Sequence, residues 1–162
     1  YILHSMKWVT RRGIHVNRTA TAWLIRRFLD PAAELLFVES SQVAEVQRCD
    51  GAVGFDAPGA TYPHEDDQGR CSFEQLVAER IPGDPALAAL ALIVHGADFP
   101  AQIDVTRESA GLWAISQGFT EVGHDDLDIV QRASFLYDSL YAHLCRASED
   151  GARRTYPAES HP

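Results

Sequence analysis

The chain has 162 residues, a length that suits a single domain able to bury roughly two thirds of its unfolded surface. Its 14 basic and 23 acidic residues give a net charge of −9, which argues against direct nucleic-acid binding, because phosphate neutralisation supplies most non-specific affinity. Three cysteines without Cys-x-x-Cys spacing argue against a disulfide framework, and no apolar stretch approaches the ~20 residues that span a bilayer. We therefore expect a cytoplasmic protein with reduced thiols and no membrane contact.

The first half of the chain predicts a small sheet. Residues 1–5 precede Met6 and are set aside as a possible expression remnant. Expected elements are a strand at 7–10, a helix capped by Asn17 and running through 19–29, a strand at 35–38, a short helix at 42–48 and a strand at 52–55. Residues 60–62 are expected to pair back as a hairpin and to place His64 at its end.

The second half predicts helices. Ser72 and Gln75 have capping-box spacing, so a helix is expected over 72–80 with Glu74 in its first turn. Asp84 and Pro85 predict the start of a helix over 85–98, followed by helices over 107–117 and from 125 to about 146. The fold class is α+β: a small early sheet covered by five or six helices, in one domain over residues 6–146, with a polar, mobile tail at 147–162.

Four side chains form a candidate metal site. His95 and Asp98 end an apolar helix and lie about one turn apart, and His64 and Glu74 add an imidazole and a carboxylate. This mixture suits a divalent zinc, iron or manganese ion. Each residue also has an explanation without a metal. His95 and Asp98 could form a buried pair, Glu74 could complement the helix dipole from the first turn, and His64 could be an exposed loop histidine.

Basic residues near the N-terminus form a candidate anion site. Residues 1–29 carry six basic side chains and no acid, a local charge of +6, whereas the remainder carries 8 basic and 23 acidic residues, or −15. Side chains at the start of the first helix and along one of its faces could bind a small anion: His15, Asn17, Arg18, Arg26 and Arg27. Salt bridges from these arginines to the acidic body are the alternative.

The chain resembles the C-terminal domain of the chromate-resistance protein B family. The resemblance spans residues 7 to 141 and rests on these stretches: Trp8–Arg18, Ala22–Pro31, Phe55-Asp-Ala-Pro-Gly-Ala, His64, Ser72-Phe-Glu, Asp84–Leu87 and Ile93–Asp98. It implies a role in chromate resistance. Longer members resemble chromate-responsive regulators with an added N-terminal region thought to bind DNA, so this chain is expected to be the isolated domain. The family usually has aspartate where this chain has Asn17, and the residue type at Cys71 varies.

Three functions are compatible with these residues. The first is a binding domain for a metal, an oxyanion such as chromate, or a small carboxylate. The second is a metal-dependent enzyme that acts on a small anion, with Glu74 as ligand or base. The third is a metal-free regulatory module. The absence of a Gly-x-Gly-x-x-Gly, Walker or nucleophile-elbow motif leaves nucleotide-dependent chemistry without support, and a homodimer is an open alternative to a monomer.

Overall fold

The computed structural model describes residues 5–155, with side chains through Gly151. Its strands are β1 (Lys7–Arg11), β2 (Glu34–Val38) and β3 (Val53–Gly54). Its α-helices are α1 (Val16–Leu24), α2 (Val43–Asp50), α3 (Ser72–Arg80), α4 (Pro85–Asp98), α5 (Ser109–Gln117), α6 (Phe119–Val122) and α7 (Asp126–Thr155). Shorter turns are a π-helical turn at Ile25–Leu29 and 3-10 turns at Ser40–Gln42 and Pro100–Gln102.

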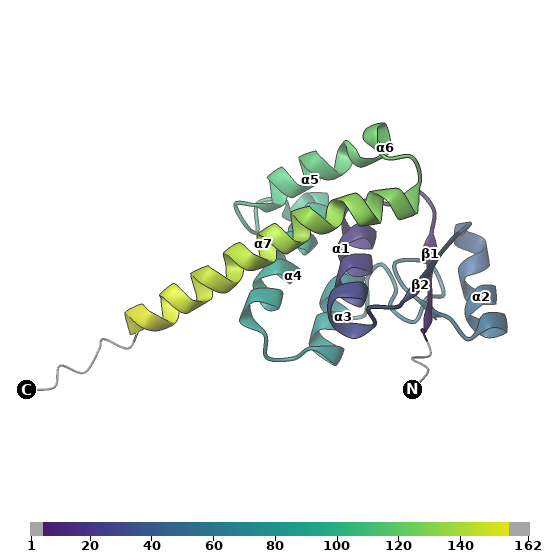
Figure 1. Cartoon of the computed structure of the whole chain (residues 1–162), viewed down its shortest axis with the longest axis horizontal. Coiled ribbons are helices and arrows are strands. Elements are labelled where there is room, and N and C mark those ends of the chain that lie inside the picture. The colour runs from purple at the N-terminus through teal and green to yellow at the C-terminus, as the bar shows by residue number, and fades with distance from the viewer. Residues whose placement is uncertain (1–4, 156–162) are drawn as a thin grey trace, which may run out of the picture.

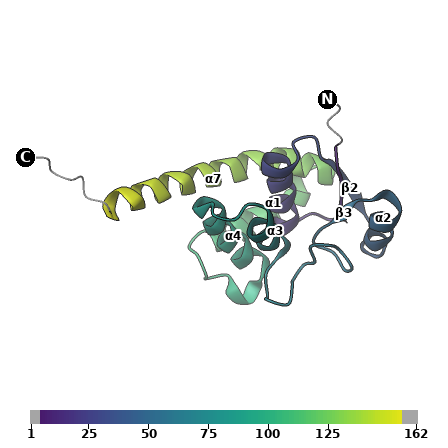
Figure 2. The ribbon, with the colours of Figure 1, turned by 90° about the horizontal axis from the view of Figure 1, so that it is seen from below.

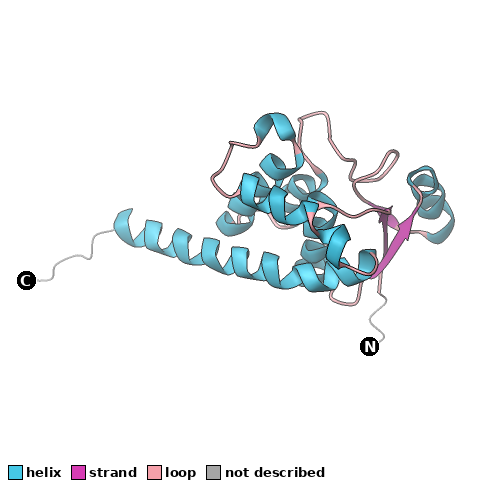
Figure 3. Ribbon diagram, turned by 90° about the horizontal axis from the view of Figure 1, so that it is seen from above, coloured by secondary structure: helices cyan, strands magenta, loops and turns pink. Residues whose placement is uncertain are grey.

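The three strands form one parallel sheet with the order β2-β1-β3. Alternating side chains of β1 enter two different cores, because successive residues of a strand face opposite sides of the sheet. Val9 packs with Val43 beneath α2, whereas Trp8 belongs to the larger core formed with the other helices. The sheet is therefore covered by α2 on one face and by the helical body on the other (Figures 1 and 3). The predicted α+β class is confirmed.

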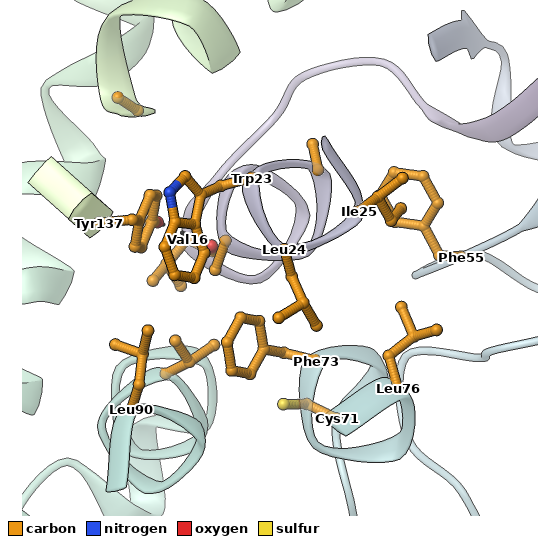
Figure 4. Packing of buried hydrophobic residues seen from close by; sticks show 14 of the residues in the cluster. Val16, Trp23, Leu24, Ile25, Phe55, Cys71, Phe73, Leu76, Leu90 and Tyr137 are labelled. Carbon is orange, nitrogen blue, oxygen red and sulfur yellow. Dashed lines mark hydrogen bonds between the residues drawn. The ribbon is translucent and has the colours of Figure 1, made fainter. Parts of the chain in front are cut away.

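Helix α1 lies at the centre of the larger core. All nine of its residues are buried, and Trp23 and Leu24 lie near Phe73 of α3 and Tyr137 of α7 (Figure 4). The Tyr137 hydroxyl donates to the Val16 carbonyl oxygen at 3.0 Å, and Trp23 Nε1 donates to Asp138 at 2.8 Å. These two hydrogen bonds fix α7 against α1 and give the large aromatic residues partners for their polar atoms.

Helix α7 extends well beyond the body of the molecule (Figure 2). It runs to Thr155, so the expected helix end near residue 146 is wrong. The apolar stripe that predicted the helix finishes at Leu144, and past that point the helix continues without such a stripe. The expectation for residues 1–5 falls mostly on residues 1–4, and residues 156–162 of the predicted mobile tail likewise lie outside the described residues, whereas residues 147–155 belong to α7.

Two local predictions in the first half of the chain are wrong. His15, not Asn17, occupies the N-cap of α1, and Asn17 lies inside the helix. Residues 60–62 do not form a hairpin: Tyr62 makes an isolated parallel bridge with Phe55. Its amide donates to the Gly54 carbonyl oxygen at 3.0 Å, so the chain still turns back on the end of β3 before it reaches His64.

Candidate functional site

Asp56 lies at the carboxyl edge of the sheet, two residues after β3. Its φ of 49° is in the left-handed region that non-glycine residues rarely adopt, and its amide donates to the Tyr62 carbonyl oxygen at 2.8 Å. The carboxylate is only 4% exposed. An unusual backbone conformation that directs a buried acid at a strand end is a frequent feature of functional sites.

Two arginines approach Asp56 from β1 and α1. Arg11 Nε donates to the Asp56 carbonyl oxygen at 2.9 Å, and a terminal nitrogen of Arg11 lies 3.6 Å from Oδ1. Arg18 places a terminal nitrogen 3.6 Å from Asp56 Oδ2 and donates with the other to the Gly13 carbonyl oxygen. Burial lowers the pKa of Arg18, and Asp56 opposes that effect. Arg18 Nε has no hydrogen-bond partner among the described residues.

His64 joins the same carboxylate from the loop before α3. Its Nδ1 lies 2.8 Å from Asp56 Oδ1 and 3.5 Å from Asp98 Oδ2. The hydrogen bond to Asp56 raises the pKa of His64, so the imidazolium form is favoured. Since the His64 side chain is 42% exposed and the Arg11 side chain 34%, these two residues give the group a face toward solvent.

Asp98, the last residue of α4, is the second acid of this group. Burial, reinforced by the charge of Asp56, raises the pKa of Asp98 to about 6. Its Oδ2 is buried without a hydrogen-bond partner within residues 5–155, an arrangement that carries a desolvation cost. Asp98 therefore changes charge in mildly acidic solution, next to Arg11, Arg18 and His64. We call Arg11, Arg18, Asp56, His64 and Asp98 the sheet-edge cluster.

A second polar group lies where α3 begins. Cys71 is the N-cap of α3, its side chain accepts from the Glu74 amide, and Glu74 Oε2 accepts from the Cys71 amide at 2.8 Å. The capping box is therefore Cys71 with Glu74, and the predicted pair of Ser72 with Gln75 is wrong. Glu74 Oε2 also lies 2.6 Å from His95 Nδ1.

The Phe99 ring lies against histidines of both groups. Its centroid is 5.3 Å from the His64 ring and 4.6 Å from the His95 ring. The four predicted metal ligands thus form two pairs, with His64 beside Asp98 and Glu74 beside His95. Among the described residues, Cys71, Glu74 and His95 form a group of three possible metal ligands. One donor atom from each lies within 4.8 Å of the other two.

The five residues predicted to bind an anion lie in different parts of the structure. Arg18 belongs to the sheet-edge cluster, and the exposed His15 lies at the N-cap of α1. Asn17 is buried, and its Oδ1 accepts from the Ser72 hydroxyl at 3.1 Å and the Phe73 amide at 3.3 Å. Asn17 therefore joins α1 to the start of α3.

Arg26 and Arg27 lie on a different part of the surface. They line a groove with Trp23 and the start of α7, and Arg27 Nε is 3.7 Å from Asp138. Arg26 is eight residues from Arg18, roughly 12 Å along a helix axis, which separates the two guanidinium groups. Arg27 therefore makes the kind of contact that was the alternative to anion binding, a salt bridge to an acidic residue of the remainder of the chain.

Sequence reasoning missed Arg11 and Asp56 as site residues. Both stand within stretches that carry the family resemblance, Trp8–Arg18 and Phe55-Asp-Ala-Pro-Gly-Ala. The signal that could have found them is the position of each at the end of a predicted strand, because ligands often bind beyond the carboxyl ends of parallel strands. The register, with Val9 opposite Gly54, brings these two strand ends together.

Comparison with known proteins agrees with the resemblance. A family model described as "ChrB, C-terminal domain" matches residues 8–144. The chain belongs to the ChrB C-terminal domain family. A curated relative, Protein ChrB of Cupriavidus metallidurans, is 38% identical over 140 residues, which are 85% of this chain and 40% of that protein. This ChrB-family chain therefore spans less than half the length of that relative, and no solved structure matches it. In the described part of this ChrB-family domain, no helix is long and apolar enough to cross a membrane.

Proposed function

We propose that this domain binds a small tetrahedral oxyanion in chromate resistance, with chromate as the ligand that its family membership favours. The observation that carries the proposal is the convergence of Arg11, Arg18 and His64 on the single carboxylate of Asp56. Guanidinium groups match tetrahedral oxyanions well because their N–H donors form a planar, charged fork. Asp56 orients the three cationic side chains, and the anion accepts hydrogen bonds from their N–H groups that do not contact Asp56.

Donors remain for such a ligand. Arg18 Nε is buried and unpaired among the described residues, the Arg11 side chain is 34% exposed, and His64 presents its second ring nitrogen. An oxyanion bound beside Arg18 would satisfy a donor whose burial otherwise costs free energy. The recognition would be bidentate and charge-assisted, which favours an oxyanion over a halide.

The charges of the sheet-edge cluster suit a dianion in mildly acidic solution. With His64 and Asp98 both protonated, three cations and the single carboxylate of Asp56 leave a net charge of +2. With both deprotonated, two arginines face two carboxylates and the net charge is zero. The protonated Asp98 would also donate a hydrogen bond to the ligand instead of repelling it.

Calorimetric titration at pH 7, where chromate is mostly a dianion, with chromate and separately with sulfate tests the proposal. Wild type should bind both oxyanions, and Arg18→Lys, which keeps the charge and loses the fork, should weaken binding about tenfold or more. Arg26→Lys is the matched control on the same helical segment and should bind as wild type does. Equal affinities in wild type and Arg18→Lys, or loss of binding in Arg26→Lys alone, would contradict the proposed site.

A further inference from the structure

Cys71, Glu74 and His95 bring together three different ligand chemistries in a mostly buried group. The Cys71 side chain is fully buried, and those of Glu74 and His95 are 16% and 10% exposed. One donor atom from each residue lies within 4.8 Å of the other two. Tetrahedral metal centres with thiolate, imidazole and carboxylate ligands have donors about 3.5 Å apart, given metal–ligand distances of about 2.0–2.3 Å. Small side-chain movements would therefore bring the three donors around one ion.

The surroundings of His95 fit a ligand role. Its Nε2 lies 2.9 Å from Gln102 Oε1, while its Nδ1 faces Glu74. Metal-binding histidines almost always donate their second ring N–H to a carbonyl or carboxylate, which fixes the ring and leaves the other nitrogen for the metal. Gln102 supplies such an acceptor, and the Phe99 ring packs against the imidazole.

The donor set also limits the class of metal. A thiolate is too soft a ligand for Mg²⁺ or Ca²⁺, and its combination with imidazole and carboxylate suits Zn²⁺ or Co²⁺. We propose that Cys71, Glu74 and His95 form a site for a zinc-type divalent cation, with Gln102 as the residue that positions His95. This site is separate from the oxyanion site and does not depend on it.

Binding of the cation has a defined proton balance. The Cys71 thiol loses its proton to solvent when the metal binds. The proton in the hydrogen bond between His95 Nδ1 and Glu74 Oε2 is also lost to solvent, because the metal takes the place of both protons. No electron transfer is involved. The three protein ligands leave a fourth tetrahedral position for water or a small anion, and the partial exposure of Glu74 provides a route for entry.

Titration of the full chain with Co²⁺ tests this site, because a cobalt–thiolate bond gives a near-ultraviolet charge-transfer band. The starting protein is the Cys49→Ser/Cys145→Ser variant, in which Cys71 is the remaining thiol. This protein should bind close to one equivalent of Co²⁺ with the charge-transfer band, and Zn²⁺ should displace it. Adding Cys71→Ser should remove the band, and serine keeps a helix N-cap so that the fold survives.

Gln102→Leu tests the positioning role. It should weaken Co²⁺ binding by about 10–100-fold and leave the charge-transfer band intact at saturation. A starting protein without the band at saturating Co²⁺, or a band that survives Cys71→Ser, would overturn the site. Sulfate titration of the same samples keeps the two proposals distinguishable, since a failed metal site leaves anion binding unchanged and a failed anion site leaves the cobalt spectrum unchanged.

Discussion

Asp56 Oδ1 and His64 Nδ1 lie 2.8 Å apart, and this contact joins the end of the sheet to the loop that leads into α3. Because Asp56 is buried and also contacts two arginines, its carboxylate is the common counter-charge of the sheet-edge cluster. The cluster thus depends on one acid held in a left-handed conformation.

Asp56→Asn should destabilise the fold by about 3 kcal/mol, because it leaves the buried charge of Arg18 without its partner. Chemical denaturation of wild type and variant measures the effect. Glu39→Gln is the matched control: its ion pair with Arg12 is about two-thirds exposed on both sides, so the loss should stay below about 1 kcal/mol. Equal effects of the two substitutions would show that Asp56 does not neutralise a buried cation.

Asp98→Asn should stabilise the protein at pH 7.5. The folded-state pKa of Asp98 is raised to about 6, above its ordinary value of 3.8, so the folded protein binds more protons than the unfolded chain between these values. The Asp98 contribution therefore declines as pH rises from about 4 to 6 and stays unfavourable above that range. Replacement by asparagine should recover up to about 3 kcal/mol at pH 7.5.

Thermal unfolding of both proteins across pH 4–8 measures this difference. The melting temperatures should approach one another at pH 4, where Asp98 is protonated, and diverge in favour of the variant at higher pH. A variant less stable than wild type at pH 7.5 would mean that the ionised Asp98 is favourably paired.

Sulfate affinity should increase as pH falls from 7.5 to 5.5. Sulfate stays a dianion over this range, so the change reports protein groups, and protonation of Asp98 and His64 adds positive charge to the site. We expect about a tenfold gain, which corresponds to 1.4 kcal/mol. Calorimetry at both pH values checks it, and Asp98→Asn should show a smaller pH dependence. Affinity that is independent of pH would place the anion elsewhere.

Two glycines in helices should respond to alanine in opposite directions. A Cβ on Gly96 would lie 2.4 Å from Ser109 Oγ and 2.9 Å from the Gln102 carbonyl oxygen, so Gly96→Ala should cost about 1–3 kcal/mol. Gly111, within α5, has open space at the same position, and Gly111→Ala should stabilise by about 0.5–1 kcal/mol. Denaturation midpoints measure both. Similar losses at the two sites would contradict the tight packing of α4 at Gly96.

The sequence predicted the elements whose signals are local. Helix α4 begins and ends where Asp84-Pro85 and the apolar run indicated, and Asp84 accepts from the Ala86 and Leu87 amides. The prediction for Asn17 failed because its side chain binds the distant Ser72 and Phe73 rather than its own helix end. The capping box was missed because cysteine is seldom considered as an N-cap.

The sheet-edge cluster could be predicted only in part, because its members meet through tertiary contacts. His64 and Asp98 are both among the predicted metal ligands, and they lie 3.5 Å apart. The partnership of Arg11 with Asp56 depends on strand register and on a left-handed residue, neither of which a single sequence displays. The assignment of His64, Glu74, His95 and Asp98 to metal ligation stays a prediction.

Anomalous scattering from crystals grown with selenate at pH 6 would test the oxyanion site most directly, since selenate stays a tetrahedral dianion and its selenium atom marks its own position. We expect a strong peak within about 4 Å of the Arg18 guanidinium group, with His64 and Arg11 as further donors. A peak confined to the Arg26 and Arg27 groove, or crystals that show no peak beside Arg18, would contradict it.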